Sequence, residues 1–483
     1  MKRLSAIVKR GLPADPEITG VTADSRKVRA GTLFAALPGT KVDGASFAAA
    51  AIQAGAAAVI ADRDLGLPVP TIVAKDPRRA YALAAAEFWG RQPQVCVAVT
   101  GTNGKTSVAN FCRQMFARAG RTSASMGTLG VTVSRPDGTH EQLTPPGLTT
   151  PDAADVAEML ARIAGMGVTH FAMEASSHGV DQRRLDGVKL TAAGFLNLTQ
   201  DHLDYHGTME AYRAAKLRLF ETLLPRGGTA VLNADSDAFP AFAAAAVIAG
   251  QWVMPVGETG ATLKLAKREL LPEGQWLRIM AEGRSHDVRL PLAGGFQASN
   301  ALVAAGLCWA AGLTLEEVFA GLEALEGAPG RLQRVGQGAR GGEAYVDYAH
   351  TPDGLETVLK ALRPHVRGRL IVVFGAGGDR DRGKRPLMGK VAGELADVAI
   401  VTDDNPRSEV PAAIRAEVLA GCPGAAEIGD RREAIREAVA MLRDGDILVV
   451  AGKGHEQGQI VGGVTHPFDD VAETAQALEL VHG

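Results

Sequence analysis

Seven residues shortly after position 100 form a glycine-rich loop. They are Gly101, Thr102, Asn103, Gly104, Lys105, Thr106 and Ser107, and they follow a strand-like apolar run that ends at Thr100. Backbone N–H groups in such a loop, with the N-terminus of a following helix, favour a polyphosphate. Lys105 would reach the β- and γ-phosphates, and the Thr106 hydroxyl would bind Mg²⁺. The loop therefore predicts a nucleotide site.

The loop departs from the full pattern G-x-x-x-x-G-K-[ST] at one position, because Val99 stands where the first glycine belongs. The alternative is a glycine turn that binds nothing. A strand before the loop and a helix after it favour the nucleotide site.

Acidic and imidazole side chains follow two further strand-like runs. Glu174 ends the first run in FAMEASSHGVDQRRL, and the second segment, FLNLTQDHLDYHG, contains Asp201, His202, Asp204 and His206. Carboxylate and imidazole groups at neighbouring strand ends suit a divalent metal beside a triphosphate. The alternative for His202 is a loop histidine with no ligand role.

Lys216 lies in MEAYRAAKLRLFETLL (209–224), which has helical character. One interpretation is an ordinary, half-exposed helix lysine. The other is a buried lysine whose lowered pKa lets it take up CO₂ and become a metal-binding carbamate. Spacing alone does not decide between them.

Strand-like and helix-like runs alternate through most of the chain. The clearest strand runs are VCVAVT (95–100), RLIVVFGAGG (369–378), DVAIVTDD (397–404) and DILVVAGKG (446–454). This alternation predicts α/β domains with parallel sheets, which bind ligands at the carboxyl ends of their strands. Two linker-like stretches, WGRQP (89–93) and EGAPGR (326–331), divide the chain into predicted domains 1–90, 91–328 and 329–483.

Composition excludes several classes of protein. The net charge of −3 over 483 residues gives no general attraction to nucleic acid or to an anionic membrane. The four cysteines, Cys96, Cys112, Cys308 and Cys422, fit no C-x-x-C pair or zinc spacing. No apolar run suits a signal peptide or a membrane helix of about 18 residues. The sequence predicts a cytoplasmic protein.

Taken together, the motifs resemble the Mur ligase family, which builds the peptidoglycan stem peptide. The segments TGTNGKTS, MEASSHG, NLTQDHLDYHG, YRAAK, GRLQ, VDYAHTPD, GAGGDRDRGKRP, DDNPRSE and AGKGHE occur in the family's order, and DSRKV (24–28) extends the match to the N-terminal part. The resemblance implies three α/β domains. These are an N-terminal UDP-binding domain, a central P-loop ATPase-like domain with a mostly parallel sheet, and a C-terminal Rossmann-like domain that binds an amino acid.

The resemblance implies roles around ATP. The loop 101–107 would hold the phosphates. Thr106 and Glu174 would bind one Mg²⁺, and His202 and carbamylated Lys216 would bind a second. Asn300 matches the last asparagine of an adenine-contacting G-x-F-N-x-x-N motif, in which Gln297 replaces the first. Arg331 and Asp347 would also bind the nucleotide, although Arg331 has the alternative of an ordinary linker residue.

The resemblance also implies a site for UDP-N-acetylmuramoyl-L-Ala-D-Glu. Its uridine end would meet Ser25, Thr40, Lys41 and Val42, and its sugar and peptide would meet Thr149, Thr150, Ser176, Gln182 and Arg184. The alternative for each hydroxyl residue is a turn or a helix cap.

Two arginines at strand ends suit a carboxylate ligand. GAGGDR (375–380) does not fit the dinucleotide pattern G-x-G-x-x-G, because Arg380 replaces the last glycine. Asp404, Asn405, Pro406 and Arg407 follow another strand run, and the alternative for them is a simple turn. The resemblance implies a selectivity loop here, in which Arg407 would pair with the distal carboxylate of meso-diaminopimelate and repel the bare ammonium of lysine. The resemblance adds Gly452 and Glu456 at the amino end of the same group.

The resemblance therefore implies an ATP-dependent ligase. It would add meso-diaminopimelate to the D-glutamate γ-carboxylate of UDP-N-acetylmuramoyl-L-Ala-D-Glu through an acyl phosphate, as a monomer without nucleic-acid or membrane partners. Three alternatives stay open: a lysine-adding family member, a folylpolyglutamate synthetase, and a P-loop switch that hydrolyses ATP slowly.

Overall fold

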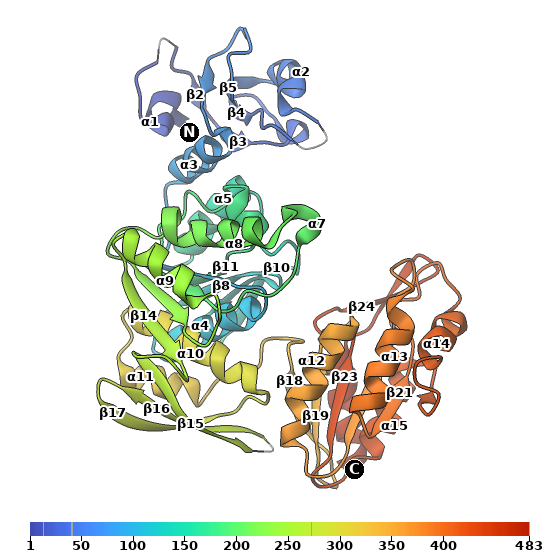
Figure 1. Ribbon diagram of the computed structural model, residues 1–483. Coiled ribbons are helices and arrows are strands. Elements are labelled where there is room, and N and C mark those ends of the chain that lie inside the picture. Colours follow the sequence, from blue (N-terminus) through green and yellow to red (C-terminus); the bar gives the residue numbers. More distant parts are fainter. Residues whose placement is uncertain (13, 40–41, 272, 483) are drawn as a thin grey trace. The chain divides into compact units, whose positions relative to one another are not determined.

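The structure is a computed structural model that describes residues 1–12, 14–39, 42–271 and 273–482 (Figure 1). Its backbone divides into two compact units. The first comprises Met1–Ala261 with Val303–Val318, and the second comprises Thr262–Leu302 with Phe319–Gly483. The predicted domain boundaries after residues 90 and 328 stay predictions.

The N-terminal part of the first unit contains a small parallel sheet. Its strands, in spatial order, are β3 (Gly20–Thr22), β4 (Thr32–Ala35), β5 (Ala56–Ala61) and β6 (Thr71–Val73). The strands β1 (Lys2–Arg3) and β2 (Glu17–Ile18) pair separately. The helices of this part are α1 (Leu4–Val8), α2 (Ala48–Gln53) and α3 (Pro77–Trp89). Apolar side chains of α1 and α3 pack against β4 and β5 in one core.

A larger sheet forms the centre of the first unit. Its strands, in spatial order, are β10 (His140–Thr144), β9 (Gly130–Ser134), β8 (Ser123–Gly127), β11 (His170–Glu174), β7 (Val95–Thr100), β12 (Ala192–Phe195), β13 (Thr229–Asn233) and β14 (Trp252–Gly257). The six strands from β8 to β14 are parallel, and β9 and β10 are antiparallel additions. The mostly parallel sheet agrees with the prediction.

Helices cover both faces of this sheet, which explains why β7 is apolar at nearly every position. On one face, Cys96 and Ala98 of β7 join a core with α5 (Ala153–Gly165) and α9 (Phe239–Ile248). On the other face lie α4 (Lys105–Arg118) and the part of α10 (Gly295–Ala310) that belongs to this unit, from Val303 onward. There a Cβ at Gly194 of β12 would come within 3.1 Å of Val303 and Leu307, so this glycine lets α10 pack closely.

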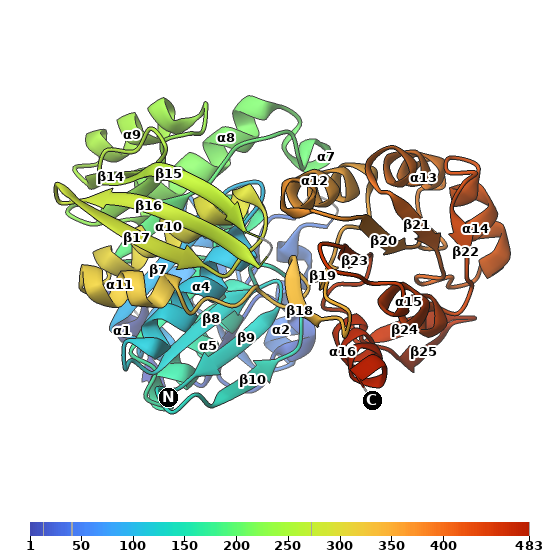
Figure 2. The same cartoon turned by 90° about the horizontal axis from the view of Figure 1, so that it is seen from below.

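The second unit contains an antiparallel group and a parallel sheet. The antiparallel group comprises β15 (Leu263–Leu271), β16 (Gly274–Ala281) and β17 (Arg284–Leu290) (Figure 2). The other sheet has the order β18 (Gln333–Gln337), β19 (Glu343–Asp347), β23 (Ile447–Ala451), β20 (Leu370–Phe374), β21 (Val398–Val401) and β22 (Ala426–Glu427). Only β18 runs antiparallel in it. A hairpin follows, formed by β24 (Gly458–Val461) and β25 (Val464–Pro467).

Two helical layers enclose this second sheet. One layer consists of α12 (Pro352–Leu362), α13 (Lys384–Leu395) and α14 (Pro411–Leu419), and the other of α15 (Arg431–Ala440) and α16 (Asp470–His482). Alternate residues of the strands face opposite layers: Val372 packs with α12, whereas Val373 packs with α15. This three-layer arrangement explains the continuous apolar runs of β20 and β23.

The predicted helix over 209–224 is two segments. The α-helix α8 runs over Met209–Arg218, and one π turn continues it over Leu219–Leu223. The remaining short helices are α6 (Ser177–Asp181), α7 (Leu203–His206) and α11 (Leu315–Leu322). Among the described residues, no helix has the length and apolarity to cross a membrane.

Candidate functional site

The glycine-rich loop over residues 101–107, here called the phosphate loop, connects the end of β7 to the start of α4, as predicted. Val99 is a buried strand residue, so the loop begins later than in the longer pattern. Gly104 precedes α4 with φ of 90°, a left-handed conformation that favours glycine. The turn therefore leads directly into the helix N-terminus, where backbone N–H groups gather.

The segment after β12, which contains Asn197 and Thr199, forms hydrogen bonds with this loop. The Asn103 N–H donates to the Asn197 side chain at 2.9 Å, and the Asn197 amide donates back to the Asn103 carbonyl at 3.2 Å. The Thr102 hydroxyl donates to the Thr199 carbonyl at 3.1 Å. Lys105 Nζ donates to the carbonyls of Gly101 and Thr102 at 2.8 and 2.7 Å, so this lysine lies across the loop.

Thr106 and Glu174 meet beside the loop. The Thr106 hydroxyl donates to Glu174 Oε2 at 3.0 Å, and the Thr128 N–H donates to Glu174 Oε1 at 2.8 Å. Both Thr106 and Glu174 are buried. A Cβ at Gly127 would overlap the Glu174 carboxylate, so this glycine makes room for it. Two adjacent oxygen donors fit a hard cation such as Mg²⁺.

Lys216 is buried below the loop, with only 1% of its surface exposed. Its Nζ donates to the Gly101 carbonyl at 2.8 Å and lies 4.3 Å from the Tyr212 ring centroid. Burial, and secondarily the charge of Lys105, lowers the pKa of Lys216 well below its usual value. The structure therefore does not support a half-exposed helix lysine, and the lowered pKa favours the neutral amine that carbamate formation requires.

His202 is exposed and belongs to a cluster of rings. Its ring lies 4.8 Å from that of His178 and 6.2 Å from that of Tyr212, the residue that Lys216 also contacts. Its Nε2 is 3.5 Å from Asp201 Oδ2. Within the described part of the chain, no group of three or more His, Cys, Asp and Glu side chains could hold a metal.

Of the five residues predicted to contact the sugar and peptide, four are joined by hydrogen bonds, and the fifth, Thr149, is linked to them through Thr128 and Glu174. Thr149 bonds Thr128 at 3.0 Å, Thr150 bonds Ser176 at 2.9 Å, and Arg184 donates to the Thr150 carbonyl at 2.6 Å and to Gln182 at 2.7 Å. Ser176 also caps α6 by accepting from the Gly179 N–H, the role that the alternative gave it. The Thr150 hydroxyl donates to the Glu174 carbonyl at 3.1 Å, which links the group to the phosphate loop region.

Two of the predicted uridine contacts, Ser25 and Val42, are described residues in the N-terminal part of the first unit. Ser25 begins a short 3₁₀ turn, and it lines a cavity of about 880 Å³ together with Thr22, Tyr81 and Asp152. Val42 is exposed. Thr40 and Lys41 lie outside the described residues.

The predicted nucleotide contacts of the second unit are buried or face aromatic rings. Asn300 Nδ2 donates to Gln297 Oε1 at 3.0 Å. The Arg331 guanidinium lies 5.0 Å from the Tyr348 ring centroid. Asp347 ends β19 and accepts from the N–H groups of Leu332 and Ala349 at 2.6 and 2.8 Å. Burial raises the pKa of Asp347 to about 6, against the opposing charge of Arg331.

The residues predicted to bind the amino acid follow β20, β21 and β23. The segment Asp404–Arg407 follows β21, and Gly452 and Glu456 follow β23. Asn405 joins them, since its Nδ2 donates to Glu456 Oε2 at 2.9 Å. A Cβ at Gly452 would lie 2.5 Å from Asp404 Oδ2, so Gly452 permits this close approach. Pro406 is buried, whereas Arg380 is exposed after β20.

Sequence reasoning missed Lys453, Arg385 and Glu409. Lys453 is fully buried and donates to Asn405 Oδ1 at 2.9 Å. Arg385 is also fully buried and pairs with Glu409. Lys453 lies in GKGHE, Arg385 in GKRP and Glu409 in PRSE. These segments contain or adjoin the predicted contacts, and that proximity is the sequence feature that could have indicated the three residues.

Together, the strand–loop–helix phosphate site and the polar strand ends define a P-loop nucleotide-binding protein of the α/β class. Three family models match the chain: the Mur ligase family, catalytic domain over residues 17–87, the Mur ligase middle domain over 99–308, and the Mur ligase glutamate ligase domain over 330–454. The chain belongs to the Mur ligase family. This confirms the resemblance and the three-domain α/β fold.

Relatives match the chain over its whole length. It is 70% identical over 480 residues to the UDP-N-acetylmuramoyl-L-alanyl-D-glutamate--2,6-diaminopimelate ligase of Caulobacter vibrioides, covering 99% of both chains. It is 55% identical to the enzyme of the same name from Mesorhizobium japonicum, covering 96% of both. A solved structure of a ligase with this name is 36% identical, with a TM-score of 0.78 over 100% of this chain and 99% of that one.

Proposed function

We propose that the protein is an ATP-dependent ligase that joins meso-diaminopimelate to the D-glutamate γ-carboxylate of UDP-N-acetylmuramoyl-L-Ala-D-Glu, in the synthesis of the peptidoglycan precursor. The observation that carries this proposal is the full-length similarity to ligases named for that reaction. The phosphate loop and the strand-end arginines supply chemistry that the reaction needs.

In the first step, the γ-carboxylate attacks the γ-phosphorus of ATP, which gives an acyl phosphate and ADP. Residues 101–107 would hold the phosphates through backbone N–H groups, and Lys105 would offset charge on the transferring group. Mg²⁺ held by Thr106 and Glu174 would neutralise further negative charge. The hydrogen bond between these two side chains supports their sharing one ion.

Lys216 has the properties required for a carbamate. Burial lowers the pKa of its amine, which favours the neutral form. That form would attack CO₂ and lose a proton, which gives a carbamate anion with two oxygen donors. His202 lies beside the same tyrosine ring, so the carbamate and the imidazole could bind a second Mg²⁺.

The UDP-dipeptide would bind residues of the first unit. Thr149, Thr150, Ser176, Gln182 and Arg184 would contact sugar and peptide, because hydrogen bonds join them, Thr149 through Thr128 and Glu174, into one polar group. Ser25, with Thr40, Lys41 and Val42, would contact the uridine end, and the cavity at Ser25 offers the volume.

In the second step, the diaminopimelate amine attacks the acyl carbon, and phosphate leaves. Arg380 and Arg407 would pair with the distal carboxylate, and Asp404, Asn405, Pro406, Gly452 and Glu456 would surround the amino end. Glu456 supplies the negative charge that an ammonium group needs. Asn300, Arg331 and Asp347 would contact the nucleotide.

The same proposal assigns the UDP end to residues 1–90, ATP to 91–328 and the amino acid to 329–483. The use of ATP and a nucleotide-linked substrate supports a cytoplasmic location. The monomeric state stays a prediction.

Phosphate release tests the function. Purified protein with ATP, Mg²⁺ and the UDP-dipeptide should release phosphate when meso-diaminopimelate is added and much less with lysine. Release with folate and glutamate, or release indifferent to any amine, would contradict the proposal and support one of the alternatives.

A further inference from the structure

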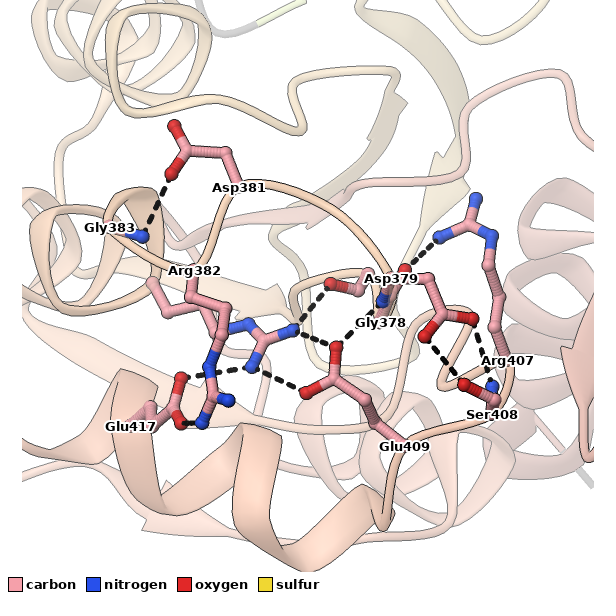
Figure 3. Close-up of polar contacts among 11 residues, drawn as sticks. Gly378, Asp379, Asp381, Arg382, Gly383, Arg407, Ser408, Glu409 and Glu417 are labelled. Atoms are coloured by element: carbon pink, nitrogen blue, oxygen red, sulfur yellow. Dashed lines mark hydrogen bonds and ion pairs between the residues drawn. The ribbon is translucent and has the colours of Figure 1, made fainter.

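Two loops of the second unit carry the arginines proposed to meet the distal carboxylate. The first, here called the glycine loop, comprises residues 375–383 after β20 and contains Arg380. The second, the selectivity loop, comprises residues 404–409 after β21 and contains Arg407. Figure 3 shows polar contacts that join the two loops.

A buried guanidinium lies under both loops. The side chain of Arg385, at the start of α13, is 0% exposed. It donates to both carboxylate oxygens of Glu409, from Nη2 at 2.7 Å and from Nη1 at 3.0 Å. It also donates to Glu417 of α14 at 2.9 Å and to the Gly377 carbonyl at 3.1 Å. One side chain thus holds the selectivity loop, the glycine loop and a helix, through a bidentate pair that fixes direction as well as distance.

Glu409, which Arg385 holds, also bonds the backbone of the glycine loop. Its Oε1 accepts from the Asp379 N–H at 2.7 Å. The Asp379 carboxylate in turn accepts from the Ser408 hydroxyl at 2.6 Å and from the Ser408 N–H at 3.2 Å. In Figure 3 the Asp379 and Ser408 side chains point toward each other. Asp379 and Ser408 are the immediate neighbours of Arg380 and Arg407.

Both loops contain a residue in a costly backbone conformation. Asp379 and Arg407 each have φ of 54°. A non-glycine residue in the left-handed region costs about 1–2 kcal/mol, so the surroundings must hold it there. For Asp379 these are the contacts with Glu409 and Ser408. For Arg407 they include its N–H, which donates to the Ile460 carbonyl at 2.9 Å.

The two loops also contact each other through the backbone of Gly378. Arg407 Nη1 donates to the Gly378 carbonyl at 2.7 Å, and the Gly378 N–H donates to the Asn405 carbonyl at 2.9 Å. A Cβ at Gly378 would overlap the Pro406 carbonyl oxygen, and one at Gly377 would lie 2.8 Å from Arg407 Nη1. The glycines of GAGG therefore allow loop packing, which explains them without a dinucleotide.

We propose that Glu409, fixed by Arg385 and bonded to Asp379, is a positioning residue that sets the spacing of Arg380 and Arg407 and so determines selectivity for an amino acid with a distal carboxylate. This inference rests on the proposed function. Arg385 and the Asp379 N–H also lower the pKa of Glu409 to about 2, so its carboxylate stays ionised at neutral pH.

The test compares Glu409→Gln with Glu427→Gln. Both remove a carboxylate that pairs with an arginine, but Glu427 pairs with Arg415 instead. For Glu409→Gln, we expect the KM for meso-diaminopimelate to rise about tenfold, as for loss of a charge-assisted hydrogen bond. The preference for meso-diaminopimelate over lysine, as a ratio of kcat/KM, should fall similarly. The KM values for ATP and the UDP-dipeptide should stay within about twofold, and Glu427→Gln should behave as wild type.

Ser408→Ala provides a second variant if Glu409→Gln does not fold. Ser408 is exposed, and the substitution removes only the hydroxyl bond to Asp379. We expect a smaller rise, about threefold, in the KM for meso-diaminopimelate alone.

The outcomes separate the two proposals. A wild-type enzyme that does not require meso-diaminopimelate contradicts the proposed function, whatever the variants do. A selective wild type with folded variants whose KM for meso-diaminopimelate is unchanged overturns the positioning role. An equal rise in the KM values of all three substrates also overturns it, since it indicates a general structural effect.

Discussion

The Thr106 hydroxyl lies 3.0 Å from the Glu174 carboxylate, although 68 residues separate them in the sequence. The two meet because β7 and β11 are adjacent and parallel, so that their carboxyl ends share one edge of the sheet. A hydroxyl and a carboxylate at this edge, next to the phosphate loop, form a pair of oxygen donors that the fold itself positions.

Glu174→Gln should impair metal use. The amide keeps the size of the side chain but removes the charge that a cation needs, so we expect kcat to fall by about 100-fold or more. The Mg²⁺ concentration for half-maximal rate should also rise. Phosphate release measured across a Mg²⁺ titration checks this, with the exposed Glu221→Gln as the control. An unchanged Mg²⁺ dependence would remove Glu174 from the proposed ligands.

Lys216 should carry a carbamate. Incubation with ¹³C-labelled bicarbonate should give a carbamate signal by NMR in the wild type and none in Lys216→Ala. We expect the variant to lose at least about 100-fold in kcat while ATP binding persists, because Lys105 remains. Lys189→Ala, which replaces an exposed lysine, should keep both the signal and the rate. A fully active Lys216→Ala would contradict the carbamate.

Arg407→Ala should affect one substrate selectively. Loss of a desolvated charge pair costs about 2–5 kcal/mol, or roughly 30-fold to several-thousand-fold in kcat/KM for meso-diaminopimelate. The KM for ATP should stay unchanged. Steady-state kinetics for each substrate provide the measurement, and Arg436→Ala replaces an exposed arginine of the same unit as a control. Equal losses for ATP and meso-diaminopimelate would indicate a structural residue.

Asp347 should make stability depend on pH. Its folded-state pKa, about 6, lies above its usual value of 3.8. The stabilisation from its protonated form is therefore fully present below the unfolded value and is lost as pH rises through about 6. The side chain of Asp347→Asn stays neutral at every pH, so the variant does not lose this stabilisation. The free energy of unfolding of the variant minus that of the wild type should therefore increase from pH 4 to pH 7.5, by at most about 3 kcal/mol.

Urea unfolding at these two pH values measures that difference. Asp444→Asn, which replaces an exposed aspartate of the same unit, should track the wild type at both. A constant difference between Asp347→Asn and wild type would show that this carboxyl does not titrate in the range.

The sheets could largely be predicted from sequence. A strand covered on both faces must be apolar throughout, and VCVAVT coincides with β7 over Val95–Thr100. The antiparallel strands β15–β17 were not predicted. They mix charged and apolar residues, as in LKLAKRELL, because some of their side chains are exposed and others buried. Such runs lack the signal of a buried parallel strand.

Burial of charged residues could not be predicted. Lys216 sits on α8 at a position whose spacing fits a surface residue, whereas in the structure it is buried and bonds the carbonyl of Gly101, 115 residues away in the sequence. Arg385 is similar, since its partners Glu409 and Glu417 come 24 and 32 residues later. These partners come together only through the packing of α13 and α14, which periodicity does not describe.

The shared contacts of the glycine loop and the selectivity loop have a consequence for redesign. Grafting the four residues Asp404–Arg407 alone into a ligase that uses lysine should not transplant the substrate preference. The donor segment would arrive without the aspartate, the glutamate and the buried arginine that fix its conformation. Residues 375–385 and 404–417 would have to be exchanged as one cassette, because neither segment is an independent module.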